Sequence, residues 1–293
     1  MVKMGVFWGC CIVTEHYAYE MSLREVMPAL GVELVDLNGA SCCGDPIKSV
    51  NDIAVTYLSA RTLALAHQAG LTELLAPCNR CHLTLSEAKY RLQNDPQTRS
   101  KVQVLLDEEG LTYSDEIHIW HTIDFLHDKI TPDGIKKKIR TQLSKFKFAT
   151  HPGCQILRPS EIGRVDNAEA PAKLDELVRA LGAETFDYSE KLDCCGAALF
   201  QTRQDAALSL AGAKVKVLQD YGVDGMVVSC PDCHLMYDYK QEAASSTIGA
   251  KLKLPVFYYT QLLGVALGID NAKLGLNLNQ SPVEELLKKH NLA

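Results

Sequence analysis

The sequence predicts an α/β protein made of two pseudo-symmetric repeated halves, each built around parallel β-strands. Three observations lead to this prediction. The 293 residues are enough for two domains of ordinary size. A set of cysteines recurs after a long, fixed interval, which indicates a duplicated domain rather than a solenoid of short repeats. Within each half, short apolar runs alternate with amphipathic stretches, the order expected of parallel strands connected by helices.

The first half opens with a short apolar run at residues 5–8, which we expect to be a buried strand that delivers a Gly-Cys pair to a loop. Residues 22–30 have helical periodicity and stop at a glycine, and a strand-like run at 32–36 follows. A longer amphipathic helix is expected at 51–68. The apolar run at 71–76 then leads into the next cysteines.

The second half repeats this order, and we expect domains at residues 1–146 and 147–293. The lysine-rich stretch 136–147 is the expected connection, although its charges are equally typical of a solvated helix face. Sites in parallel sheets gather in loops at the carboxyl ends of strands, and every cysteine cluster follows such a strand. The expected elements are a strand at 147–150, a helix at 172–181, a strand at 183–187, a helix at 204–219 and a strand at 225–229.

Eleven cysteines form the most informative pattern in the chain. A double cysteine and a later Cys-x-x-Cys motif recur with each position moved by the same 152 residues, from Cys42 to Cys194 for example. A Gly-Cys pair precedes each block. Ten cysteines therefore form two matching sets of five: Cys10, Cys42, Cys43, Cys78 and Cys81 in the first half, and Cys154, Cys194, Cys195, Cys230 and Cys233 in the second.

Composition and charge exclude several classes of protein. The chain is 47% hydrophobic and 23% charged, as in ordinary globular proteins, and its net charge of -6 argues against a nucleic-acid binder. No apolar run reaches the ~20 residues that cross a bilayer, so we expect no membrane insertion. The first eight residues lack the apolar segment of a signal peptide, so we expect a cytoplasmic protein. Many thiols in a reducing compartment point to metal or redox chemistry.

Three kinds of cysteine chemistry compete. Disulfides fit poorly, because adjacent Cys42 and Cys43 would close a strained ring and the compartment disfavours them. Structural zinc uses Cys-x-x-Cys pairs, but one pair here is a direct dipeptide and five thiolates exceed what one zinc ion needs. Iron–sulfur chemistry fits best, because consecutive cysteines can bind different irons of one cluster. Glycines beside the cysteines, such as Gly44 and Gly196, would let backbone N–H groups approach the sulfurs.

The ordered motifs Gly-Cys, Cys-Cys-Gly and Cys-x-x-Cys, and their repetition, resemble the duplicated cysteine-rich (CCG) domain in the B subunits of heterodisulfide reductases. The resemblance covers about residues 3–265. It implies two noncubane [4Fe–4S] clusters, each held by one set of five cysteines, which face each other across the domain interface. It also implies reductive cleavage of a small-molecule disulfide such as the coenzyme M–coenzyme B heterodisulfide.

The same resemblance implies partner proteins. Electrons would arrive from a ferredoxin-like C subunit, itself supplied by a flavin-containing A subunit. The alternative is an electron-transfer subunit of a sulfur-oxidising or other heterodisulfide-reductase-like complex that acts on a different thiol or disulfide. Both cysteine sets are complete, which favours catalysis over electron transfer alone.

Three histidines and one extra cysteine remain. His82 and His234 each follow the last cysteine of their set, where a hydrogen-bond donor to the ligands or an ordinary loop histidine is expected. His151 precedes Cys154 by three residues and is a candidate proton donor to a leaving thiolate, although a loop-capping role is equally compatible. Cys11 has no counterpart in the second half, so the repeat assigns Cys10 as the ligand and leaves Cys11 spare.

Overall fold

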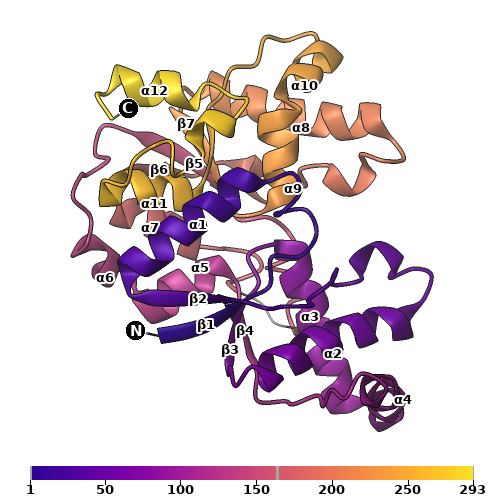
Figure 1. The fold of residues 1–293 in the computed structure, drawn as a ribbon. Helices are drawn as coiled ribbons and strands as arrows, with labels where there is room; N and C mark the ends of the chain where they lie inside the picture. The colour runs from indigo at the N-terminus through magenta and orange to yellow at the C-terminus, as the bar shows by residue number, and fades with distance from the viewer. Residues whose placement is uncertain (1, 163–164, 293) are drawn as a thin grey trace.

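Two four-stranded sheets, all parallel, organise the computed structural model, which describes residues 2–162 and 165–292 (Figure 1). The strand order is β2-β1-β3-β4 in the first half and β6-β5-β7-β8 in the second, so both halves have the same topology. The predicted α/β fold with two repeated halves is confirmed. No helix in the described part of the chain is long and apolar enough to cross a membrane.

The helices and strands follow the predicted alternation. In the first half they are β1 (Val2–Val6), α1 (Tyr17–Leu30), β2 (Val32–Asp36), η1 (Asp45–Ile47), α2 (Asp52–Gln68), β3 (Glu73–Leu75), α3 (Asn79–Asn94), α4 (Pro96–Asp107), β4 (His118–Trp120), α5 (Thr122–Asp124), η2 (Phe125–Ile130) and α6 (Pro132–Lys136). In the second half they are β5 (Lys147–His151), α7 (Lys173–Ala180), β6 (Glu184–Phe186), η3 (Ser189–Leu192), η4 (Ala197–Leu199), α8 (Gln204–Asp220), β7 (Gly225–Val228), α9 (Pro231–His234), η5 (Leu235–Tyr239), α10 (Gln241–Ile248), β8 (Val256–Tyr258), α11 (Tyr259–Leu267), η6 (Leu276–Leu278) and α12 (Val283–Lys289).

Two elements, β1 and α1, start more than two residues away from the sequence prediction. Strand β1 occupies Val2–Val6 rather than 5–8, since the chain leaves the sheet before Gly9, whose positive φ of 66° ends extended backbone. Helix α1 starts at Tyr17, five residues earlier than the periodicity alone indicated. Most of the lysine-rich connection, beyond Lys136, is loop rather than a solvated helix face.

The strand order places a topological switch point in each half. Strand β1 has β2 on one side and β3 on the other, so the chain leaves β1 and β3 in opposite directions around the sheet. Ligands of open parallel sheets bind at such a point, just beyond the carboxyl ends of the strands. The loops after β1 and β3 carry cysteines of the first set, and the loops after β5 and β7 carry those of the second.

The two halves are packed together through helices that cross from one to the other. Helix α1, which follows the first strand, packs along α11 of the second half, and the two lie side by side in Figure 1. Its Tyr19 ring stacks on Tyr258 at 4.3 Å, and its Ser22 hydroxyl lies 2.7 Å from that of Thr260. In return, α7 of the second half contacts α5, η2 and α6 of the first. These contacts determine how the two sheet edges, and the cysteine loops on them, face each other.

Candidate functional site

Each cysteine set is assembled from three loops at the carboxyl edge of its sheet. In the first half, Cys10 follows β1, the double cysteine follows β2, and Cys78 caps the N-terminus of α3 with Cys81 in its first turn. In the second half Cys230 caps α9 in the same way. A helix N-terminus carries a partial positive charge and free N–H groups, which favour thiolates over thiols.

The thiols of the first half contact one another in a closed ring. The Cys42 thiol donates to the Cys10 sulfur at 3.9 Å, and neighbouring thiols influence one another's pKa values in the order Cys42, Cys43, Cys81, Cys78, Cys11 and Cys10. The Cys42 thiol, followed by Cys81, lowers the pKa of Cys43 to about 3, and the Cys11 and Cys81 thiols hold the pKa of Cys78 well below its usual range. The Cys11 thiol, which the repeat left unassigned, therefore neighbours two thiols of the first set, those of Cys10 and Cys78.

The second set forms an open chain of five sulfurs, because no residue corresponds to Cys11. Neighbouring thiols influence one another's pKa values in the order Cys154, Cys194, Cys195, Cys233 and Cys230. The Cys154 thiol, followed by Cys195, lowers the pKa of Cys194 to about 2, whereas the pKa values of Cys154 and Cys233 rise because their protons are the ones shared. In each set, thiols with raised and lowered pKa values are therefore neighbours.

Glycines shape the double-cysteine loops as the sequence predicted. The Gly44 N–H donates to the Cys42 sulfur at 3.4 Å, and the Gly196 N–H donates to the Cys194 sulfur at 3.3 Å. Gly196 has a φ of 87°, and a Cβ placed on it would lie 2.8 Å from the carbonyl oxygen of Ala207. Only glycine therefore allows this loop to pack closely on α8 and direct its N–H at a sulfur.

The three candidate histidines are all buried beside the cysteine sets. His82 and His234 lie in the first turns of α3 and α9, and burial lowers the pKa of His82 to about 4 and that of His234 to about 3. His151 ends β5, and burial holds its pKa well below the usual range. All three imidazoles are therefore neutral at pH 7.

An ion pair joins the two Cys-x-x-Cys turns across the boundary between the halves. Arg80, inside the first motif, pairs with Asp232, inside the second, at 2.7 Å, and with Asp45 at 3.4 Å. Beside it, the Asn79 amide donates to the carbonyl oxygen of Pro152 at 2.9 Å. A small cavity of about 40 Å³ lies here, lined by all five second-set cysteines and by Asn79 and Arg80 from the first half.

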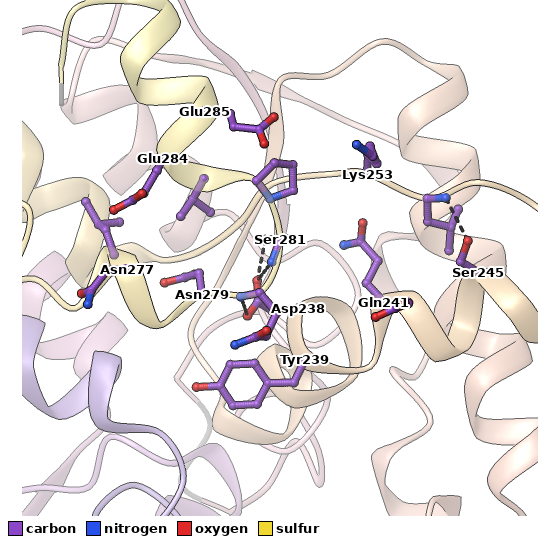
Figure 2. A pocket seen from close by; sticks show the side chains of 16 residues that line it. Asp238, Tyr239, Gln241, Ser245, Lys253, Asn277, Asn279, Ser281, Glu284 and Glu285 are labelled. Atoms are coloured by element: carbon purple, nitrogen blue, oxygen red, sulfur yellow. Dashed lines mark hydrogen bonds between the residues drawn. The ribbon is translucent and has the colours of Figure 1, made fainter.

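A larger hollow, of about 530 Å³, lies away from the cysteines between η5, α10 and the C-terminal segment (Figure 2). Its central carboxylate, Asp238, accepts hydrogen bonds from the backbone N–H groups of Gln280 and Ser281, and Figure 2 shows Asp238 and Ser281 directed at each other. These hydrogen bonds anchor the C-terminal segment, so Asp238 has a structural role.

The sequence analysis missed Arg80, Asp232 and the buried Lys214. Arg80 and Asp232 occupy the same position of the repeated motif and carry opposite charges. The repeat could therefore have predicted an ion pair between the two motifs. Lys214 is 3% exposed, and burial lowers its pKa to about 8, which leaves it mostly protonated at pH 7. Nothing in an amphipathic helix pattern marks a lysine as buried.

The residues fit an iron–sulfur cluster in each half on two grounds. Thiolates are the donors that such clusters use, and hydrogen bonds to sulfur tune them. In the described residues, most of the buried side-chain nitrogens and oxygens without a hydrogen-bond partner also lie beside the cysteines, as a site completed by a further group requires. They belong to Asn79, Arg80, His82, His151, His234 and Tyr237, with Asp124 the exception. No group of three or more His, Cys, Asp or Glu side chains in residues 2–162 and 165–292 is arranged to hold a metal ion.

Comparison with solved structures agrees with the fold. A hypothetical protein from Helicobacter pylori superimposes with a TM-score of 0.75 at 17% sequence identity. The match covers 95% of this chain and 51% of that one, so the chain spans about half of that structure. This likeness concerns the fold alone.

Sequence comparison identifies the family. The model of the cysteine-rich domain CCG matches residues 4–86 and again residues 148–238. The chain is 35% identical to the B subunit of a ferredoxin/F(420)H(2)-dependent CoB-CoM heterodisulfide reductase from Methanosarcina acetivorans, over 99% of this chain and 97% of that protein. It is 31% identical to a protein from Archaeoglobus profundus described as similar to the heterodisulfide reductase B subunit, over 99% and 98%. The chain, with its two CCG domains, belongs to the family of heterodisulfide reductase B subunits.

Proposed function

We propose that this protein is the catalytic iron–sulfur subunit of a cytoplasmic heterodisulfide-reductase-type complex and reductively cleaves a small-molecule disulfide. Residues 1–146 and 147–293 act as its two domains, and each holds one noncubane [4Fe–4S] cluster through its five-cysteine set. The observation that carries the proposal is the Arg80–Asp232 ion pair, because it joins the two Cys-x-x-Cys turns and so brings the sets to opposite sides of one boundary. The CoB-CoM heterodisulfide is the substrate suggested by the relative from Methanosarcina.

The reaction consumes two electrons and two protons and converts one disulfide into two thiols. When bound, the clusters supply the electrons one at a time and bind sulfur. The protein's own residues hold this geometry: the helix N-termini at Cys78 and Cys230 and the N–H groups of Gly44 and Gly196 offset negative charge on the thiolates. Holding both reaction partners in position before the S–S bond opens removes an entropic cost.

Hydrogen for the departing thiols comes through the histidines, of which His151 is the first candidate and His82 and His234 the others. Because burial keeps their imidazoles neutral, each acts as a proton relay: the ring N–H passes a proton to the departing thiolate while the other ring nitrogen takes up a proton from solvent. The atoms His82 Nδ1, His151 Nε2 and His234 Nδ1 are buried and have no partner in the described protein.

The ferredoxin-like C subunit docks on the cysteine edge and receives electrons from a flavin-containing A subunit. Half of the ten exposed large apolar side chains in the described residues lie within seven positions of a cysteine, which fits a transient interface. Val50, 83% exposed, is the most prominent. We expect Val50→Asp to weaken binding of a ferredoxin-like subunit at least tenfold in calorimetry, whereas Val104→Asp on α4, 61% exposed, leaves it unchanged. Equal effects of the two substitutions would argue for a different docking face.

Metal content and turnover test the proposal together. Protein purified without oxygen carries about eight irons and as many sulfides, four of each per half. With reduced viologen as the electron donor, it consumes the CoB-CoM heterodisulfide and releases two thiols per disulfide. Stoichiometric zinc with half that iron would contradict the two-cluster proposal.

A variant separates the two-cluster mechanism from simple electron transfer. Cys194→Ser combined with Cys195→Ser removes one cluster, and disulfide cleavage is then abolished rather than slowed. Near wild-type turnover by this variant would refute the mechanism. The alternative is an electron-transfer subunit of a sulfur-oxidising or other heterodisulfide-reductase-like complex that acts on a different thiol or disulfide. Intact clusters without turnover of any disulfide in a substrate panel would support that alternative.

A further inference from the structure

A buried ammonium group distinguishes the second half from the first. Lys214 lies on α8, and its Nζ donates to the carbonyl oxygen of Asp193 at 2.6 Å and to Nδ1 of His151 at 3.2 Å. Asp193 directly precedes Cys194, so the ammonium group lies under the second double-cysteine loop. The Tyr237 ring faces the same group, with its centroid 5.9 Å away.

Lys214 has no counter-ion among the described residues. Asp175 pairs with Lys191 at 2.6 Å, the Asp193 carboxylate forms no ion pair with Lys214, and the groups that Nζ contacts are neutral. A buried charge without an opposite charge is costly, so a lysine persists in such a place when an anion is supplied. The thiols of Cys233, Cys195 and Cys194 and the Asp193 carboxylate all act electrostatically on Lys214, so a negatively charged group bound by the second cysteine set would lie within reach of this cation.

The equivalent position of the first half carries no charge. The glycine after each double cysteine packs on the following helix, against Val55 of α2 in the first half and Ala207 of α8 in the second. These contacts align the two helices residue for residue. Seven positions further along, Thr62 of the first half corresponds to Lys214, and its hydroxyl donates only to the carbonyl oxygen of Leu58.

The residues beside Lys214 are also polar where their counterparts in the first half are apolar. Strands β1 and β5 pair with β3 and β7 in matching registers, which makes Phe7 the counterpart of His151. In the repeat, Leu85 is the counterpart of Tyr237. The second half therefore replaces a threonine, a phenylalanine and a leucine with a lysine, a histidine and a tyrosine, all buried.

Lys214 also determines which nitrogen of His151 carries the proton. An ammonium group can only donate, so Nδ1 must supply a lone pair to it, and the proton resides on Nε2. The Lys191 carbonyl oxygen, also 3.2 Å from Nδ1, then receives no hydrogen bond from the ring. The Nε2 atom and the Tyr237 hydroxyl are both buried without a partner in the described protein, and their rings are in edge contact at 5.2 Å. Two unused donors thus accompany the cation beside the second set.

We propose that Lys214, with the His151 and Tyr237 donors beside it, gives the cluster of the second half the more positive reduction potential. The inference rests on the proposed function, because it requires a redox-active cluster in each half. A nearby cation and hydrogen bonds to sulfur both stabilise the reduced, more negatively charged state of a cluster. An electron shared between the two halves therefore resides mainly on the second.

Potentiometric titration followed by electron paramagnetic resonance tests this order without any substrate. Cys43→Ala and Cys195→Ala each remove one set's signal and so assign the two transitions. The transition lost in Cys195→Ala is expected at the more positive potential. If that transition is the more negative one, the proposal is wrong, whatever the behaviour of any Lys214 variant.

Variants of Lys214 identify the cause. Lys214→Met should lower the potential of the second transition by about 59 mV. For one electron, this is a tenfold change in the equilibrium between oxidised and reduced cluster. Lys214→Arg should retain most of the wild-type value. Lys216→Met, on the same helix but paired with Asp220 at the surface, is the matched control and should shift neither transition. An unshifted second transition in Lys214→Met would overturn the role of Lys214, whereas absence of iron–sulfur signals from wild-type protein would instead refute the proposed function.

Discussion

At the scale of single residues, Cys11 is the position where the repeat and the three-dimensional arrangement differ most. The spacing of the repeat assigns Cys10 to the first set, and Cys10 is exposed. The structure nevertheless brings the Cys11 thiol into contact with both Cys10 and Cys78, which closes the ring of thiols. A sixth sulfur in one half only is a second asymmetry between the halves, alongside Lys214.

Substitution of the two neighbouring cysteines separates their roles. We expect Cys10→Ser to lose about half of the iron, because the repeat pairs Cys10 with Cys154. Cys11→Ser should keep full iron content but alter the spectrum of the first cluster, since its thiol neighbours Cys78. Iron analysis and electron paramagnetic resonance measure both effects. Loss of iron in Cys11→Ser with full iron in Cys10→Ser would reverse the ligand assignment.

Asp124 is a buried carboxyl group away from the cysteines that makes stability depend on pH. Burial raises its pKa to about 7, and its Oδ1 atom has no partner in the described protein. Because the folded pKa exceeds the unfolded value of about 3.9, protonation stabilises the fold fully below pH 4, and this contribution is lost as pH rises to 7.

Asp124→Asn should remove this dependence. Relative to wild type, the variant's free energy of unfolding should rise between pH 5 and pH 8 by on the order of 2 kcal/mol. Urea denaturation at both pH values measures the difference. Asp133→Asn, at an exposed carboxylate, is the control and should show no such change. If the free energies of unfolding of Asp124→Asn and wild type differed by the same amount at both pH values, the carboxyl group would be ionised in the folded protein throughout this range.

At the scale of secondary-structure elements, the junction between a double-cysteine loop and the helix after it controls the site. The loop packs so closely on α8 that a Cβ on Gly196 would clash with the backbone of Ala207. The double-cysteine loop of the first half packs in the same way on Val55, so the same steric constraint applies to both loops. The sequence indicated the need for glycine, but the close approach to the helix is visible only in the folded chain.

Gly196→Ala should therefore displace the second double-cysteine loop and lower iron content to about half. Gly222→Ala is the matched control: it has a positive φ of 69° but nothing within 4 Å of a Cβ. It should cost only the backbone strain of roughly 1–2 kcal/mol and keep full iron. Iron analysis and thermal unfolding compare the two variants. Equal iron contents would show that the loop tolerates the shift.

At the scale of the whole molecule, contacts between the halves hold the two cysteine sets together. Helices α1 and α7, each packed against helices of the other half, supply the apolar part of this interface. Arg80 supplies its polar centre. The Asp45 and Asp232 side chains are 19% and 23% exposed, so water screens their attraction to Arg80 less than it would in a surface pair.

Arg80→Met should lower the free energy of unfolding by roughly 1–3 kcal/mol, because it leaves two carboxylates close together without their cation. Arg91→Met, which breaks an exposed pair with Asp52, should cost under about 1 kcal/mol. The midpoints of urea-induced unfolding compare them. A loss no greater than that of Arg91→Met would mean that apolar packing alone joins the halves.

The duplication and the α/β order of each half follow from spacing and periodicity along the chain, and the assignment of two five-cysteine sets is a prediction from the same spacing. The folded chain alone shows that Cys11 neighbours the first set, that Lys214 is buried without an ion-pair partner among the described residues, and that Arg80 pairs with Asp232. These depend on how α1 and α7 pack across the boundary, through contacts such as Ser22 with Thr260, 238 residues apart. Packing between such distant segments leaves no periodic trace in the sequence, since it depends on the complementary shapes of faces that form only after each half has folded.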